Sequence, residues 1–543
     1  MSPSGAAAAL DGVFAAYRSH LVRFAPIQSV LLGDAAALGR LDACFADGEA
    51  AWREESRALD ELQRRLQRIA TDSAELGLLR DVLATRLAER RLRPRLSFAH
   101  RRPDLVLDHL AEAVHQIVGW GGLTRARREG FLADLLGAVP AVLHAQAERL
   151  RGRPLPAELV ELALGTVDDV QALLARDVAI PLARAARPSG AAPLRAALAA
   201  ARAALAEYAG RLAAAPARAG GFRVGRRSLA AWLRDVEASR VPLTTVYRAA
   251  RTHLRFEHQR LLGAARRLAR GLAPEHALRL LEEERAGPDG LLRSAAEQVA
   301  ELRAFTVGRD LVSVPEDQPC RVAAAPEFLA ALTSACLDMP GPLHPSPGGT
   351  CYYLAVPRPG MPHAEQDALL RDLHLTRLTW VSAHETYPGH HVQYLHLRRA
   401  PHPILAVADS EVFIEGWAHY AEGLLVERHF RDGDLRLRVG VLWARVLRLC
   451  RMLAALGLHA GRGSPEAALR LFQRHAFLHE SEARRETLRA VSDPLVLSYA
   501  LGRMRIAARR RAAMRRAGPR FSLREFHDRL LAQGNVPLDL RTP

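Results

Sequence analysis

The sequence contains no lysine, so all 76 of its basic residues are arginine, against 59 acidic residues. A formal net charge of +17 would ordinarily suggest a polyanionic partner such as nucleic acid. The arginines, however, lie between Leu, Ala and Glu at helical spacing, which indicates biased composition and solvated helix faces. Short runs such as Arg509–Arg511 could attract anions. We expect no specific nucleic-acid partner; an arginine-rich nucleic-acid binder is the alternative that the charge suggests.

Cysteine is scarce and appears in no C-x-x-C pair, which excludes a disulfide framework and a thiolate metal site. The first twenty residues lack an apolar run behind a basic start, so they predict no signal peptide. No uncharged apolar stretch of about 18 residues predicts a membrane span. We therefore expect a cytoplasmic protein with no membrane partner. The five cysteines are Cys44, Cys320, Cys336, Cys351 and Cys450.

Walker loops, a G-x-G-x-x-G after a strand and a G-x-S-x-G elbow are also missing, which disfavours nucleotide-driven and serine-based chemistry. What the chain does have is helical periodicity. Leu59, Leu62 and Leu66 repeat at three and four residues, and Leu194 and Leu198 begin a similar stripe. The sequence predicts a mainly α, large multi-helix fold.

One short segment reads as a strand, Cys351–Val356, and it gives a small β element before the predicted active-site helix. The Pro and Gly residues from Pro216 to Gly221 mark the main internal boundary. We predict an N-terminal helical region over residues 1–219 and a catalytic helical region with the metal site over 220–543. The two are expected to form one compact unit around a cleft.

A metal-site signal lies in the segment Ser382–His391, where His384 and Glu385 precede His390 and His391. Zinc hydrolases need neutral imidazoles as ligands and a nearby carboxylate that takes a proton from the attacking water. In H-E-x-x-H the second histidine lies one helical turn after the first. Here Pro388 occupies that position and cannot coordinate.

The spacing leaves two candidates for the second histidine ligand. A regular helix would bring His391 back to the face of His384. Pro388 and Gly389 disfavour a regular helix, and a two-residue bulge would put His390 in the ligand position. We favour His390 and keep His391 as its rival.

The third ligand is expected from the helix predicted over Glu411–Glu427. Glu411, Glu415 and Glu422 share one face of it with His419. Without the upstream motif this would be an ordinary amphipathic helix with solvated carboxylates. With that motif we predict Glu415 as the ligand, and Glu422 behind it as the residue that orients a ligating imidazole.

These segments resemble a known family. His384–Gln393 and Glu415–Glu422 (E-G-W-A-H-Y-A-E) are similar to the signature of the bacterial domain-of-unknown-function family 885, which is grouped with helical gluzincin-type zinc peptidases of the carboxypeptidase Taq and oligopeptidase types. Further similarities cover roughly Gly220 to Arg510. They are Gly221–Gly225, Gly349–Tyr353 and Asp493–Gly502.

The resemblance implies that Glu415 is a metal ligand and that Tyr499 lines the site. Two departures from the family pattern follow. Leu495–Val496 replaces the family's Gly-Gln, a change that could alter substrate contacts near Tyr499. His419 stands at a usually apolar position and could compete as a ligand.

Together the residues predict a zinc-dependent peptidase with one Zn²⁺ per chain. Glu385 would act as the general base, and Tyr499, Tyr352 or Tyr353 would stabilise the oxyanion. Arg503, one turn after Tyr499, could bind a substrate carboxylate. The alternatives are a helical binding or scaffold protein with a decayed site, and a zinc hydrolase of another amide or ester.

Overall fold

The computed structural model of the chain describes residues 3–45, 49–96, 102–183, 192–218, 220–315, 318–326, 329–330, 333–344, 349–358 and 360–541. The described residues are mainly α-helical, with a few short strands. This confirms the helical fold class that the sequence predicts. Residue 219, at the predicted boundary, lies outside the described residues. The chain groups into two compact units, one made of Met1–Val224 with Pro340–Gly348 and the other of Gly225–Met339 with Gly349–Pro543.

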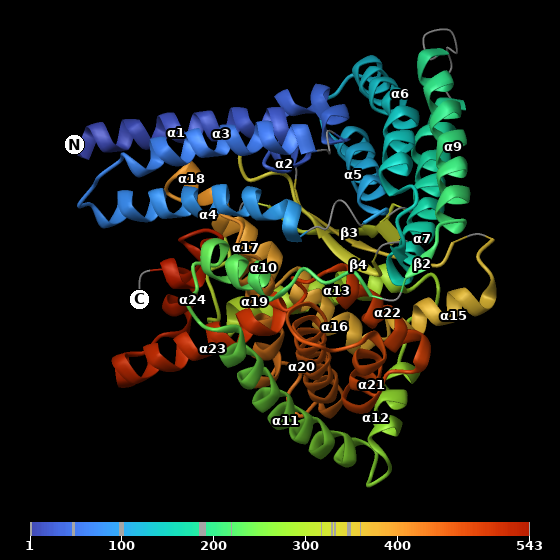
Figure 1. The fold of residues 1–543 in the computed structure, drawn as a ribbon. Helices are drawn as coiled ribbons and strands as arrows, with labels where there is room; N and C mark the ends of the chain where they lie inside the picture. Colours follow the sequence, from blue (N-terminus) through green and yellow to red (C-terminus); the bar gives the residue numbers. More distant parts are fainter. Residues whose placement is uncertain are drawn as a thin grey trace. The chain divides into compact units, whose positions relative to one another are not determined.

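The first unit is built from packed helices, of which α6 and α9 run side by side in the same direction (Figure 1), with Arg211 near the end of α9 paired to Glu148 near the end of α6. In the later part of this unit, the two-residue strands β1 and β2 pair in parallel. Its elements are α1 (Pro3–Phe24), α2 (Pro26–Leu31), η1 (Ala35–Phe45), α3 (Glu49–Gln67), α4 (Ala74–Leu96), α5 (Leu105–Gly119), α6 (Arg125–Leu150), β1 (Leu155–Pro156), α7 (Ala157–Leu173), η2 (Leu174–Ala179), α8 (Ile180–Ala183), α9 (Ala192–Ala213) and β2 (Ala217–Arg218).

The two predicted leucine stripes lie on helices of this unit and face its interior. Leu59, Leu62 and Leu66 of α3 are buried, as are Leu194 and Leu198 of α9. Among the described helices, α6 is long and apolar enough to cross a membrane by length and composition, and about a third of its apolar stretch is buried. A core helix passes the same test.

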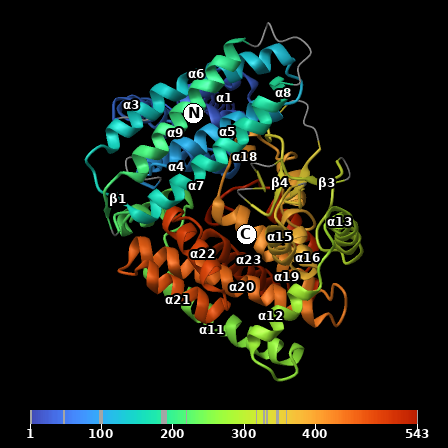
Figure 2. The same cartoon turned by 90° about the vertical axis from the view of Figure 1, so that its right-hand side faces the viewer.

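The second unit carries the predicted site residues, and α20, α22 and α23 lie side by side in it (Figure 2). Its elements are α10 (Arg226–Ala231), η4 (Trp232–Val236), α11 (Leu243–Leu268), α12 (Pro274–Glu283), α13 (Leu291–Gly308), β3 (Arg321–Ala324), β4 (Ala335–Asp338), β5 (Cys351–Leu354), α15 (His363–Asp372), α16 (Leu375–Glu385), α17 (His390–Leu397), α18 (Pro403–Ala406), α19 (Glu411–Glu427), α20 (Leu435–Ala455), η5 (Leu456–Ala460), α21 (Pro465–Ala476), α22 (Glu480–Ser492), α23 (Ser498–Ala517), η6 (Gly518–Arg520), α24 (Leu523–Leu531) and η7 (Leu538–Leu540).

A three-stranded mixed sheet precedes the site helices in the second unit. Its strand order is β3-β5-β4, with β3 parallel and β4 antiparallel to the central strand β5. Strand β5 spans Cys351–Leu354, which confirms the strand predicted from the sequence. In this order β4 is an edge strand, so one side of its backbone is not paired within the sheet.

Helix α19 is the core helix of the second unit and contacts α16, α17, α20 and α23. It starts where Ser410 Oγ accepts a hydrogen bond from the Phe413 amide at 3.1 Å, the usual way a serine begins a helix. From Gly416 to Leu425 every residue is buried. A helix buried on all sides is expected to be apolar, so polar residues within this stretch must find partners inside the protein.

Two glycines allow α19 and α23 to pack backbone against backbone. A Cβ added at Gly502 would lie 1.8 Å from the Val412 carbonyl oxygen, and one added at Gly416 would lie 2.4 Å from Gly502 Cα. Neither neighbour is a flexible side chain that could move aside. The crossing therefore fixes α19, which carries Glu415 and Glu422, against α23, which carries Tyr499.

Replacing Gly502 with alanine should destabilise the second unit, because the methyl group forces the two helices apart. We expect a loss of about 2 kcal/mol or more, seen as a melting midpoint about 4 to 8 °C lower in calorimetry. The matched control is Gly263→Ala on α11, where an added Cβ meets nothing within 4 Å. That change should be neutral or stabilising by up to about 1 kcal/mol. Equal melting of the two variants would show that the crossing is not tight.

Candidate metal centre

The two histidines of the site stand on consecutive helices that meet at a sharp break. Helix α16 ends at Glu385 and α17 begins at His390, so the chain is not one regular helix. At the break, a Cβ on Gly389 would lie 1.9 Å from the His384 carbonyl oxygen. Only glycine allows this approach. The indole of Trp417 on α19 fixes the break by donating to the Pro388 carbonyl at 3.1 Å.

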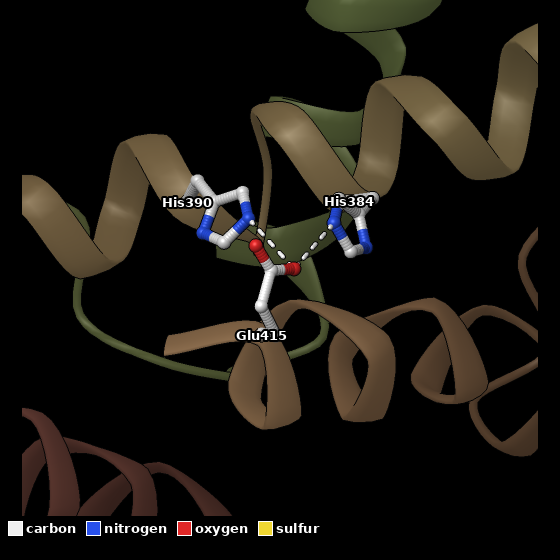
Figure 3. Close-up of side chains that lie close together, drawn as sticks. All are labelled: His384, His390 and Glu415. Carbon is white, nitrogen blue, oxygen red and sulfur yellow. Dashed lines mark ion pairs between the residues drawn. The ribbon is translucent and has the colours of Figure 1, made fainter. Parts of the chain in front are cut away.

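The break brings His390 rather than His391 beside His384. Figure 3 shows both imidazoles pointing toward the carboxylate of Glu415, which rises from α19. His384 Nε2 lies 3.5 Å, and His390 Nε2 3.7 Å, from Glu415 Oε2. The ligand-type atoms of the three residues all lie within 4.8 Å of one another. This group could hold a metal ion.

The geometry of the three side chains fits a shared cation better than direct hydrogen bonding. Both nitrogen–oxygen separations exceed the usual length of an N–H···O bond. Glu415 Oε2 is buried and has no hydrogen-bond partner among the described residues. Two donors of a tetrahedral ion, at bond lengths of about 2.0 to 2.2 Å, lie about 3.3 to 3.6 Å apart. The donor set of two imidazoles and one carboxylate therefore fits a metal ion.

Glu422 orients the first imidazole from behind. Its Oε1 lies 2.7 Å from His384 Nδ1, so the other ring nitrogen, Nε2, faces Glu415. The same carboxylate is 2.8 Å from Arg448 Nη2 and 3.1 Å from His419 Nδ1. Because Glu422 is fully buried, these contacts compensate the cost of its charge.

The charges of this group shift its pKa values strongly. Burial opposes the carboxylate of Glu422, but Arg448 and the two histidines lower its pKa far below the ordinary value. Burial likewise opposes Glu415, whose pKa the neighbouring His384 and His390 lower well below normal. Burial disfavours charge on His384, yet its carboxylate neighbours raise its pKa to about 9. A metal ion must therefore displace a proton there.

Glu385 lies next to the group without belonging to it. Its Oε2 accepts a hydrogen bond from the Leu337 amide of β4 at 3.0 Å. Burial raises the pKa of this carboxyl, and His384 and His390 counteract part of that effect. A carboxyl with a raised pKa beside a group that could hold a metal ion is suited to accept a proton.

The alternative ligands named from the sequence are placed elsewhere. His391 is buried with its Nδ1 at 2.8 Å from Thr350 Oγ1, and burial lowers its pKa to about 4. His419 is buried with its Nδ1 on Glu422. Glu411 is exposed in the first turn of α19. The structure brings none of them to the group of His384, His390 and Glu415.

Of the residues predicted to contact the substrate, some lie at the site and others lie elsewhere. The Tyr499 ring stacks near His384, with centroids 6.2 Å apart. Tyr352 is fully buried and its hydroxyl accepts from Ser382 at 3.2 Å, while Tyr353 faces the other side of β5. Arg503 is not at the site. It is buried with its Nη2 3.3 Å from Glu257 of α11.

Sequence reasoning missed three contacts at the site. Arg448 holds Glu422, Gln393 Oε1 lies 3.2 Å from His390 Nδ1, and the Leu337 amide holds Glu385. Nothing distinguishes Arg448 from the other arginines, and a backbone amide leaves no trace in a sequence. The i,i+3 spacing of His390 and Gln393 on one helix is the only feature that could have been noticed.

A second buried carboxyl fixes the start of α19. Glu237, after η4, accepts hydrogen bonds from the Ser410 hydroxyl and, at 3.2 Å, from the Val412 amide. It is fully buried, and burial raises its pKa to about 7. Its position ties the segment before α11 to the helix that carries Glu415.

Comparison with known proteins gives a family and a fold. The model of a family described as "Bacterial protein of unknown function (DUF885)" matches residues 26–541. A solved structure described as a "putative lipoprotein of unknown function" from Shewanella oneidensis aligns with a TM-score of 0.78 at 18% identity, over 98% of each chain. Another, a "putative lipoprotein" from Colwellia psychrerythraea, aligns with a TM-score of 0.78 at 17% identity, over 98% of this chain and 97% of that chain. No curated protein matches. The similarity to the solved structures shows the fold alone.

Removing the central carboxylate should abolish tight metal binding. In a competition with a chromophoric chelator, the wild type should take up one divalent ion per chain. Glu415→Gln should bind it on the order of 100-fold more weakly or not at all, because a neutral amide replaces the ligand. Glu411→Gln, on the exposed first turn of the same helix, should bind as the wild type does. If all three proteins bind equally, the ion does not sit at this group.

Glu237 should make stability depend on pH. A carboxyl whose folded pKa of about 7 exceeds its ordinary value of 4.5 stabilises the fold at low pH, and that contribution is lost as the pH rises through 7. Between pH 5 and pH 8 the wild type should lose up to about 3 kcal/mol relative to Glu237→Gln. Melting midpoints of both proteins at the two pH values measure this. A difference in stability between the two proteins that is the same at both pH values would mean that Glu237 is ionised throughout.

Proposed function

This chain belongs to the DUF885 family of bacterial proteins, and from that premise we propose that it is a zinc-dependent hydrolase that cleaves peptide bonds of oligopeptides. The observation that carries the proposal is the position of Glu385 beside the group of His384, His390 and Glu415. Metal ligands alone would suit a structural site. A carboxyl with a raised pKa directly beside them adds the proton acceptor that hydrolysis requires.

The donor set supports zinc. Catalytic zinc sites use three protein ligands, among them the combination of two histidines and one glutamate, and keep one position open for water or substrate. Zinc supplies a Lewis acid that lowers the pKa of water and polarises a carbonyl group. His384, His390 and Glu415 would hold it. Glu422 would keep the imidazole of His384 in the ligating tautomer through its bond to Nδ1.

The roles of the other residues follow from their contacts. Glu385 takes a proton from the attacking water as the water oxygen bonds to the scissile carbonyl carbon. It then passes that proton to the leaving nitrogen as the C–N bond breaks, so an acid and an amine leave the site. The Tyr499 hydroxyl, on the ring that stacks near His384, would donate to the carbonyl oxygen as negative charge develops there.

The edge strand supports a peptide as the substrate, rather than an isolated amide or ester. Strand β4 has one side that pairs with no other described strand, and its Leu337 amide points from that side to Glu385. An extended peptide could pair along this edge as an additional strand and so present one of its bonds to Glu385. We propose on the same ground that the fold is arranged like the helical gluzincin-type peptidases that the sequence resembles.

Two further aspects remain predictions. A decayed site in a binding or scaffold protein would keep the helices but lack turnover, and the replaced Leu495–Val496 element lies just before Tyr499, with Val496 buried. The cytoplasmic location is also a prediction, and the two similar structures are described as lipoproteins. Fractionation of cells that express the protein, followed by immunodetection, decides the location.

Glu385→Gln should abolish hydrolysis and leave metal binding intact, because the change removes the proton acceptor and no ligand. We expect a loss of at least about 10³-fold in kcat toward an oligopeptide mixture read by mass spectrometry. Zinc content should stay at one per chain in the variant. A chelator should stop the wild type, and added zinc should restore it. Near-full turnover by Glu385→Gln would contradict the mechanism.

A further inference from the structure

Arginines on α20 and α22 lie around Tyr499, and one of them forms no ion pair with a carboxylate of the described residues. Arg448 pairs with Glu422 at 2.8 Å, and Arg451 forms two contacts of 2.6 Å with Glu486. Arg489, in the last turn of α22, makes no ion pair among the described residues. Its Nη2 donates instead to the Tyr499 hydroxyl, at 3.4 Å. The side chain is exposed, so a ligand can reach it.

Tyr499 connects the guanidinium of Arg489 to the metal-ligand group. On one side its ring lies nearly parallel to that of His384, at 15° and 6.2 Å between centroids. On the other its hydroxyl meets Arg489, and the Arg489 guanidinium carbon lies 5.9 Å from the ring centre. An exposed guanidinium that forms no ion pair among the described residues, at this distance from a reaction centre, is suited to bind an anionic group of the substrate.

We propose that Arg489 binds the terminal α-carboxylate of a peptide and thereby makes the enzyme a carboxypeptidase that releases one or two residues. This inference rests on the proposed peptidase function and names the end of the substrate on which it acts. The α-carboxylate is the anion that every peptide carries at a fixed distance from its last bond, whatever its side chains.

The reach of the two groups limits where cleavage occurs. The carbonyl oxygen of the substrate's cleaved bond would lie about 2.7 Å from the Tyr499 hydroxyl. An oxygen of the substrate's terminal carboxylate would lie about 2.8 Å from the Arg489 nitrogen. With the two groups 3.4 Å apart, the two substrate oxygens lie within about 9 Å of each other. An extended chain spans about 3.3 to 3.6 Å per residue. No more than two residues fit between the cleaved bond and the carboxylate.

The test compares two libraries of N-acetylated hexapeptides of random sequence, one with free C-terminal carboxylates and one with C-terminal amides, incubated with the zinc-loaded protein. The wild type should cleave the free acids on the order of 10 to 100 times faster than the amides, and only at the last one or two bonds. Arg489→Met should lose that preference, mainly through a higher KM for the acids. Arg489→Lys, which keeps the charge, should restore part of it.

Arg515→Met is the control variant. It removes another exposed arginine, about 24 Å along α23 from Tyr499, and should keep the preference of the wild type. Equal cleavage of acids and amides by the wild type, or cuts far from the C-terminus, would overturn the inference and leave the peptidase function standing. A preference for terminal Glu over Gln that persists in the amides would assign Arg489 to a side-chain carboxylate instead. No cleavage of either library would contradict the peptidase function itself.

Discussion

The close contact between Gly389 and the His384 carbonyl oxygen is the constraint on which the site depends. It ends α16 and starts α17 within four residues, so that two histidines six positions apart meet on one side. A continuous helix would have presented His391 in place of His390. Trp417 lies on α19, the helix that supplies Glu415. Its indole donates hydrogen bonds to the carbonyl groups of Pro388 and Gly389 at the break. The same interface therefore forms the break and brings the third ligand-type residue to it.

Burial of charge on α19 explains much of the surrounding architecture. Glu422 lies in the fully buried stretch of α19, where an unpaired carboxylate would be costly, and it is held by His384, His419 and Arg448. These partners also fix the ring of His384. The positive charge of Arg448 is in turn compensated by Glu422 and covered by the faces of Trp380 and Tyr499. The stability of the core and the orientation of the site thus depend on one ionic network.

The sequence predicted the helical class, the strand at Cys351 and the meeting of His384 with His390 and Glu415, because these follow from periodicity and local breaking residues. It could not predict that Arg503 pairs with Glu257, which lies 246 positions away. Nor could it single out Arg448 or Arg489 in a chain whose 76 basic residues are all arginine. Such assignments depend on which helices pack together, and spacing along the chain does not report that.

A crystal structure of the zinc-soaked protein, with anomalous data collected at the zinc edge, tests the central claim most directly. The account predicts one strong peak bonded to His384 Nε2, His390 Nε2 and the Glu415 carboxylate, with bond lengths of about 2.0 to 2.2 Å and an open fourth position facing Glu385. A peak bound by His391 or His419, or no peak near α19 in zinc-soaked crystals, would contradict it.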